Sequence, residues 1–210
     1  MLAIIDYGGG NMGSLLAALT RRGIDFSIVT DPTALAQADA AILPGDGAFE
    51  ATMTALRTRG LDQPIAAMLA RNQPFLGICV GMQVLFESST EHGGATGFGF
   101  FPGVVERFGS DAPRVPHMGW NALEIVSTHP VLDNIDSGEY VYFLHSYRVP
   151  VGEGTIAASI HGERFAAVVA RGNVIATQFH PEKSQHTGGK ILDGFLRIVS
   201  AYTPPIQSHG

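Results

Sequence analysis

The stretch that decides the fold is Pro74 to Gln83, PFLGICVGMQ, which holds the one cysteine of the chain. The apolar run Phe75–Ile78 predicts a short buried strand, and the residues from Val80 to Phe86 have the apolar spacing of a helix. Cys79 lies at the turn between them, where flanking glycines leave room for a strained backbone, as in a nucleophile elbow. A helix beginning after Cys79 would point its free N–H groups at the sulfur and favour the thiolate. A small buried hydrophobic residue is the ordinary alternative for a lone cysteine.

Composition narrows the kind of protein. A chain of 210 residues suits one domain, which we expect over residues 1–203, with 204–210 as a loose, flexible tail. The net charge of −6 and the lack of a basic cluster argue against nucleic acid as a partner. We find no signal peptide and no apolar run long enough to cross a membrane, and a single cysteine forms no internal disulfide. We therefore expect a reduced, cytoplasmic protein.

The first 90 residues alternate strand and helix patterns. Predicted strands at Leu2–Asp6, Phe26–Val29 and Ala40–Leu43 are each followed by a helical pattern, and a further helix is expected at Asp62–Arg71. This alternation predicts an α/β fold whose central, mostly parallel sheet is flanked by helices. Ligands of such sheets gather at the carboxyl ends of the strands.

After Gly94 the pattern changes to short strands separated by Gly and Pro. These strands predict additional antiparallel pairing in the second half, and a helix at 190–202 closes the domain. The expected strands lie at 104–105, 123–126, 140–144, 156–157, 166–169 and 174–179.

A thiolate nucleophile needs a base at the end of a neighbouring strand. The strand pattern Val174–Phe179 ends at His180, Pro181 keeps His180 extended, and Glu182 points the same way as His180. Cys79, His180 and Glu182 thus predict a nucleophile, a base and an orienting carboxylate. His145 is the rival base, but no carboxylate follows it.

The remaining histidines have ordinary interpretations as turn or surface residues, and neither C-x-x-C nor H-E-x-x-H occurs, so we expect no metal and no cofactor. These histidines are His92, His117, His129, His161, His186 and His209.

A tetrahedral intermediate needs amide donors already in place for its oxyanion. The backbone N–H of Val80 is one candidate. The loop Gly45-Asp46-Gly47 can turn a second N–H inward, because glycine permits unusual backbone angles.

These motifs resemble those of the class I (triad-type) glutamine amidotransferases, which share a P-G-x-G loop, a G-x-C-x-G-x-Q elbow and a late H-P-E. The resemblance covers residues 2 to 200 and implies a flavodoxin-like fold. Within the class, four further stretches look like the glutaminase subunit of imidazole glycerol phosphate synthase: residues 6–11 (DYGGGN), 116–121 (PHMGWN), 142–147 (YFLHSY) and 178–184 (QFHPEKS).

The resemblance implies that glutamine is hydrolysed through a thioester on Cys79 and that ammonia passes to a separate (β/α)8-barrel cyclase subunit in histidine biosynthesis. There it serves to make imidazole glycerol phosphate and an aminoimidazole carboxamide ribotide. By the same resemblance, Gln83 and Glu91 hold the α-carboxylate and α-amino ends of glutamine, and Ser146 and Tyr147 offer backbone contacts.

Free ammonia is protonated near pH 7, so the partner has to cover its exit from the site. We expect Met118 and Trp120 on the docking face, with Asn11 and Lys183 beside them. A core position is the alternative for Trp120.

The chain departs from the family pattern at position 46, where Asp replaces the usual Val. A carboxylate beside an oxyanion is unfavourable, so we expect the Asp46 side chain to face away.

Two other functions stay open at this point. One is a different class I amidotransferase, a free glutaminase or a γ-glutamyl hydrolase, against which residues 116–121 argue. The other is a flavodoxin-like binding module that holds a phosphate with Gly8-Gly9-Gly10-Asn11, which leaves Cys79 and His180 unexplained.

Overall fold

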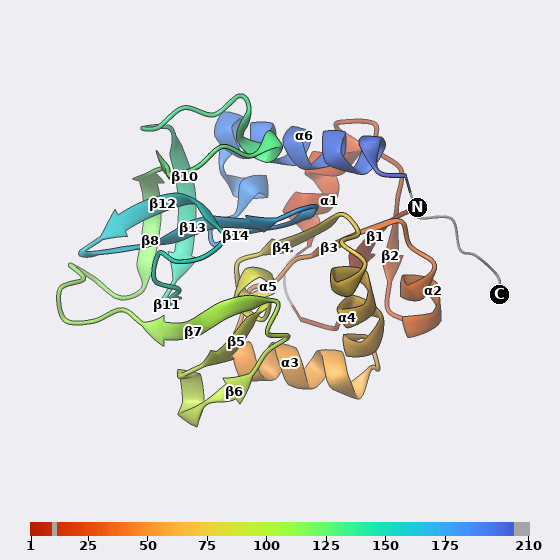
Figure 1. The fold of residues 1–210 in the computed structure, drawn as a ribbon, viewed down its shortest axis with the longest axis horizontal. Helices are drawn as coiled ribbons and strands as arrows, with labels where there is room; N and C mark the ends of the chain where they lie inside the picture. The colour runs from red at the N-terminus through yellow and green to blue at the C-terminus, as the bar shows by residue number, and fades with distance from the viewer. Residues whose placement is uncertain (10–11, 204–210) are drawn as a thin grey trace.

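The fold is built on one large sheet with helices on both faces (Figure 1). It was obtained as a computed structural model, which describes residues 1–9 and 12–203. The expected tail at 204–210 and the predicted interface residue Asn11 lie outside the described residues. The α-helices are α1 (Gly13–Thr20), α2 (Pro32–Ala36), α3 (Phe49–Thr58), α4 (Asp62–Ala70), α5 (Val80–Gln83) and α6 (Gln185–Ala201), and the 3-10 turns are η1 (Glu91–Gly93), η2 (Pro130–Leu132) and η3 (Pro181–Lys183).

The large sheet has the strand order β2-β1-β3-β4-β14-β13-β12-β9. Its first five strands run parallel and the last three are antiparallel, as the change of pattern along the sequence predicts. These strands are β1 (Leu2–Ile5), β2 (Phe26–Val29), β3 (Ala40–Leu43), β4 (Phe75–Ile78), β9 (Glu124–Ile125), β12 (Thr155–His161), β13 (Glu163–Arg171) and β14 (Val174–Thr177).

Two small sheets pack beside the large one in the described part of the chain. One has the order β11-β7-β5-β6, and the other pairs β10 with β8. Their strands are β5 (Phe86–Ser89), β6 (Ala95–Thr96), β7 (Phe101–Arg107), β8 (His117–Ala122), β10 (Tyr140–His145) and β11 (Tyr147–Arg148).

The helices bury one apolar cluster on each face of the large sheet. Leu15 and Leu19 of α1 and Phe195 of α6 belong to one cluster, and side chains of α2, α3 and α4 belong to the other. Figure 1 shows α1 and α6 on one side of the sheet and α3 and α4 on the other. Cys79 belongs to the first cluster and Val80 to the second, so these two neighbouring side chains pack on opposite faces of the sheet.

Several element boundaries differ from the prediction. The helix after Cys79 ends at Gln83 instead of continuing to Phe86, which begins strand β5 and pairs with Phe101. The closing helix begins at Gln185, five residues before the predicted start at Lys190. The predicted strands at 104–105, 140–144 and 166–169 and the hairpin between β13 and β14 are confirmed.

None of the helices in the described part of the chain is long and apolar enough to cross a membrane.

Candidate active site

Cys79 sits at a strained elbow between β4 and α5, as predicted. Its backbone has φ 56° and ψ −111°, which lies outside the regions that non-glycine residues usually adopt. The elbow fits because glycine flanks it: a Cβ at Gly81 would lie 2.1 Å from the Leu43 carbonyl oxygen, and one at Gly77 would lie 2.5 Å from the Gly81 carbonyl oxygen. Close backbone approach holds the cysteine at the carboxyl edge of the sheet.

His180 and Glu182 follow the neighbouring parallel strand β14. The register pairs Thr177 with Ile78, and the Cys79 N–H donates to the Thr177 carbonyl at 2.8 Å, so the two strand ends lie side by side. The His180 Nδ1 atom lies 2.8 Å from the Glu182 Oε1 atom, and both side chains are buried. The other ring nitrogen of His180, Nε2, is buried without a hydrogen-bond partner among the described residues.

The protonation of His180 is set by its two neighbours. Burial lowers the pKa of His180, but interactions with Cys79 and Glu182 outweigh burial and raise it to about 10. The imidazole therefore holds a proton beside the sulfur. An imidazolium beside the sulfur stabilises a thiolate, and it can deliver its proton to a leaving amine.

A cavity of about 320 Å³ opens onto Cys79 and gathers residues that are far apart in the sequence. Of the residues expected to bind substrate or oxyanion, it brings together Asp46, Gly47, Gln83, Glu91, Ser146 and Tyr147. Its other lining residues are Pro116, Leu144 and His145.

The predicted oxyanion loop packs directly against the elbow. A Cβ at Gly45 would lie 2.3 Å from the Val80 Cγ1 atom, so glycine is required for this approach. Asp46 is exposed and lines the cavity that holds Cys79. The orientation expected for the Asp46 side chain stays a prediction.

The polar groups of Gln83 and Glu91 are partly committed to the protein. The Gln83 Nε2 atom donates at 3.0 Å both to the Tyr147 carbonyl and to Gln178 Oε1, which leaves the Gln83 carbonyl oxygen for a ligand. The Glu91 Oε2 atom accepts from the backbone N–H of Phe49 at 2.8 Å. The Gln83 side-chain carbonyl oxygen and the Glu91 carboxylate can only accept hydrogen bonds, so they suit a cationic group of a ligand better than an anionic one.

Both ring nitrogens of the rival base, His145, form hydrogen bonds within the protein. Its Nδ1–H donates to the Tyr147 carbonyl at 2.8 Å, so its Nε2 accepts from Nδ1–H of His117 at 3.0 Å. Burial lowers the pKa of His145 to about 3, against the raising effect of the Tyr147 carbonyl. His145 therefore stays neutral.

His117 is buried in β8, which corrects its predicted position in a turn or on the surface. It pairs in register with His145 of β10, stacks at 4.0 Å on the His161 ring and accepts from Asn121 Nδ2 at 3.3 Å. Within residues 1–9 and 12–203, no group of three or more His, Cys, Asp or Glu side chains is arranged to hold a metal ion.

Two of the residues expected at a docking face lie on the surface. Met118 and Trp120 of β8 are 55% and 45% exposed, so the alternative core position of Trp120 is wrong. Lys183 lies in η3, between Glu182 and Ser184 in the turn that carries the base.

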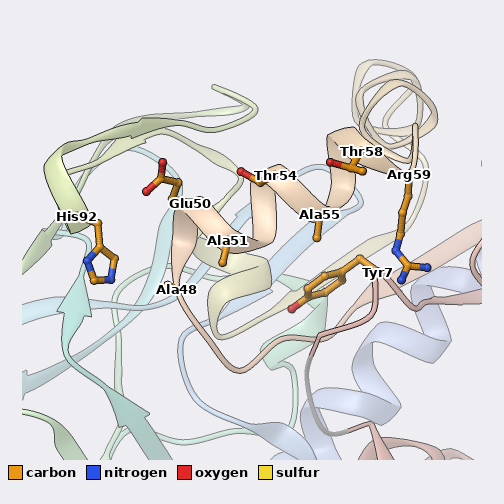
Figure 2. Close-up of a pocket in the computed structure, with 9 residues that line it drawn as sticks. All are labelled: Tyr7, Ala48, Glu50, Ala51, Thr54, Ala55, Thr58, Arg59 and His92. Carbon is orange, nitrogen blue, oxygen red and sulfur yellow. The ribbon is translucent and has the colours of Figure 1, made fainter.

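A larger hollow of about 630 Å³ runs along α3 (Figure 2). Figure 2 shows Tyr7 and Arg59 near one end of it and His92 at the other. Cys79 does not line this hollow, so we do not assign the catalytic site to it although it is larger than the cavity at the sulfur.

Sequence reasoning missed Gln178 as a site residue. Gln178 is fully buried, and its Nε2 atom lies 3.8 Å from the Cys79 sulfur. A signal was present, because Gln178 lies two residues before His180 in the predicted strand Val174–Phe179, although the structure ends β14 at Thr177.

Comparisons with known proteins agree with the geometry. The sequence pattern of the family described as "Glutamine amidotransferase class-I" matches residues 3–198. The chain is 47% identical over 208 residues to the "Imidazole glycerol phosphate synthase subunit HisH" of Synechococcus sp. (strain JA-2-3B'a(2-13)), covering 97% of this chain and 95% of the relative. It is 45% identical over 207 residues to the protein of the same name from Salinibacter ruber, covering 94% of each.

Solved structures show the same fold at lower identity. A crystal structure described as a glutamine amidotransferase has a TM-score of 0.73 at 21% identity, covering 94% of this chain and 98% of its own. A glutaminase domain of Trypanosoma brucei CTPS with bound acivicin has a TM-score of 0.62 at 17% identity, covering 97% of this chain and 96% of its own. With these likenesses and the geometry of the elbow, the chain belongs to the class I glutamine amidotransferase family and, within it, to the HisH subunits of imidazole glycerol phosphate synthase.

Proposed function

We propose that the chain hydrolyses L-glutamine to glutamate and ammonia at Cys79 and delivers the ammonia to a cyclase subunit of imidazole glycerol phosphate synthase. The observation that carries the proposal is the buried 2.8 Å pair of His180 Nδ1 and Glu182 Oε1 beside the strained Cys79. The family supports the reaction class, and the names of the relatives support the assembly.

The chemistry follows from the roles of the three side chains. The Cys79 thiolate, whose proton is held by His180 Nε2, attacks the side-chain amide carbon of glutamine. His180 returns a proton to the leaving nitrogen, which departs as ammonia and leaves a thioester on Cys79. Water, with His180 again as base, then opens the thioester to glutamate and the free thiol. Glu182 holds the imidazole in orientation throughout.

The substrate contacts differ in one respect from the expectation. Because both Gln83 N–H groups face inward, we propose that its carbonyl oxygen and the Glu91 carboxylate both receive the α-ammonium group. The α-carboxylate then falls to the backbone at Ser146 and Tyr147, which line the same cavity. The amides of Val80 and of the loop Gly45-Asp46-Gly47 serve the oxyanion.

The partner is proposed to be a (β/α)8-barrel cyclase that docks over Met118 and Trp120, with Lys183 as a further contact. Asn11, also expected at this face, lies outside the described residues. Two large apolar side chains exposed on one strand favour burial against another protein. Trp120→Ala should weaken the complex at least ten-fold, as measured by calorimetric titration with the cyclase. Ile28→Ala, an exposed apolar residue on the distant edge strand β2, is the matched control.

The test of the activity is Cys79→Ala in the assembled complex. Glutamine-dependent product formation should be lost while ammonium salts still support the cyclase. Retained glutamine turnover in this variant would reject the proposed nucleophile. A glutaminase rate that is high and unchanged by the cyclase and its nucleotide ligand would favour a free glutaminase instead.

A further inference from the structure

Gln178 lies buried beside the Cys79 sulfur and does not line the substrate cavity. It follows strand β14 directly, and none of its surface is exposed. Its Nε2 atom lies 3.8 Å from Cys79 Sγ, and its Oε1 atom accepts from Gln83 Nε2 at 3.0 Å. The proposed reaction gives this side chain no role.

The direction of these hydrogen bonds is fixed by a backbone carbonyl. Gln83 Nε2 also lies 3.0 Å from the Tyr147 carbonyl oxygen, which can only accept, so the nitrogen of Gln83 faces Tyr147. The second hydrogen of that nitrogen then faces the oxygen of Gln178. Reversing the Gln178 amide would place two donors against each other, so an N–H of Gln178 faces the sulfur.

The other groups around the sulfur contribute little to stabilising a negative charge on it. The Leu144 carbonyl oxygen lies 3.8 Å from Sγ, and a carbonyl can accept from a thiol but repels a thiolate. Helix α5 has only four residues, so its dipole is small. Apart from His180, stabilisation of the thiolate therefore falls to a direct side-chain contact.

We propose that Gln178 is a positioning residue that donates a hydrogen bond to the Cys79 thiolate and holds the sulfur towards His180. This inference rests on the proposed function, in which Cys79 is the nucleophile. When the thiol proton moves to His180 Nε2, the Gln178 N–H compensates the negative charge left on the sulfur.

Two substitutions distinguish the proposed role, in which Gln178 donates to the Cys79 sulfur, from the alternative, in which Gln178 only accepts a hydrogen bond from Gln83. Gln178→Met has similar length and no donor. Gln178→Glu keeps an oxygen that accepts from Gln83 but replaces the N–H beside the sulfur by a second oxygen. If Gln178 donates to sulfur, both variants fail; if it only supports Gln83, the glutamate variant behaves as wild type.

The main readout is the pH dependence of alkylation by iodoacetamide, in which the sulfur displaces iodide. Cys79 is the only cysteine, so the mass gained reports this site alone. Both variants should need a pH about one unit higher for half-maximal alkylation, which is about ten-fold less thiolate at a given pH below the midpoint. The kcat for glutamine should fall about ten-fold with little change in KM. A wild-type alkylation profile in either variant would overturn the proposal.

A matched control uses a buried glutamine outside the site. Gln73 is buried, and its Nε2 atom donates to the Ala38 carbonyl, so Gln73→Met carries a comparable folding penalty. It should leave the alkylation profile unchanged. Cys79→Ala separates the two claims: glutamine turnover in that variant rejects the proposed function, whereas an essential Cys79 with unchanged Gln178 variants rejects only this inference.

A measurement on the wild-type chain covers the case in which both variants misfold. The side-chain NH₂ proton shifts of Gln178 should follow the titration of the thiol and should change on alkylation. Amide signals that do not respond to either would overturn the proposal.

Discussion

The Nδ1 atom of His117 lies 3.0 Å from the Nε2 atom of His145, and both rings are buried beside the substrate cavity. Because His145 donates from its other nitrogen to the Tyr147 carbonyl, its Nε2 has to be unprotonated to accept from His117. The Nε2 atom of His117 has to be unprotonated as well, because it accepts from Asn121 Nδ2. The wall of the cavity at 145–147 thus depends on two uncharged histidines.

This pair predicts a loss of stability in mild acid. Burial, with the charge of His161, lowers the pKa of His117 to about 4, and burial lowers that of His145 to about 3. Between these values and 6.5 the unfolded chain binds more protons, so the stabilisation present above pH 6.5 is lost as the pH falls. The free energy of unfolding should drop by up to about 1.4 kcal/mol per pH unit for each histidine.

Urea titrations between pH 7 and pH 5 measure this slope. His117→Gln should flatten it, and His186→Gln, at an exposed position, should leave it as in the wild type. Equal slopes in all three proteins would contradict the assignment.

The pair of His180 and Glu182 predicts the opposite behaviour. Since interactions with Cys79 and Glu182 raise the pKa of His180 to about 10 despite burial, the stabilisation is complete below pH 6.5 and is lost as the pH rises through 10. Glu182→Gln should lower the titration midpoint of His180, followed by NMR of its ring protons, and should reduce kcat at least 100-fold. An unchanged midpoint would mean that Glu182 does not set the charge of the imidazole.

Glu91→Gln should separate substrate binding from folding. The variant keeps an oxygen for the Phe49 N–H, which lies at the start of α3, but it loses the charge facing the α-ammonium group. We expect KM for glutamine to rise about ten-fold or more with kcat nearly unchanged, because a charge-assisted contact is lost. Glu91→Ala should add a loss of about 1 kcal/mol in the free energy of unfolding. A normal KM in Glu91→Gln would move the ammonium site elsewhere.

Tyr7→Phe should stabilise the isolated chain or leave its stability unchanged. Burial raises the pKa of Tyr7, an effect that Thr52 partly offsets, yet the phenol oxygen is buried without a hydrogen-bond partner of ordinary geometry among the described residues. Removing an unsatisfied hydroxyl while the ring stays packed gains up to about 1 kcal/mol. Thermal unfolding measures the change, and a lower Tm would show that the hydroxyl has a partner in solution. The ring lies at the edge of the hollow in Figure 2.

Gly81→Ala should disrupt the elbow. The added methyl group would meet the Leu43 carbonyl at 2.1 Å, so either β3 or the elbow has to move. We expect a loss of about 2 kcal/mol or more in the free energy of unfolding. Cys79 in this variant should be alkylated no faster than an ordinary thiol. Gly152→Ala, where the added carbon would lie 3.9 Å from the Pro150 carbonyl oxygen, is the control and should change neither quantity. A stable, fully reactive Gly81→Ala would show that the elbow is not tightly constrained.

Local patterns in the sequence predict the elbow and the base because each lies within a few residues. The two-residue spacing of His180 and Glu182 indicates the pair, although the structure forms it through the 3-10 turn η3 and not through extended backbone. The glycines beside Cys79 mark the turn. The parallel half of the sheet is likewise visible in the alternation of strands and helices.

Contacts made only by strand pairing could not be predicted in this way. His117 meets His145 because β8 pairs with β10, and β8 carries no period-two pattern that would have revealed it. Gln178 meets Gln83 across 95 residues of chain, so its orientation depends on the finished fold. Phe86 continued a helical spacing, but its pairing with Phe101 made it a strand.

The packing of Cys79 and Val80 on opposite faces of the sheet has a consequence for how such a protein can be improved. Since each of these neighbours is packed into a different apolar cluster, a repacking on either face shifts one end of the peptide bond that sets the nucleophile. Screens for heat resistance that enlarge core side chains should therefore yield many variants with higher thermal stability but lower glutamine turnover. Stabilising substitutions at the surface, far from both clusters, should leave glutamine turnover unchanged.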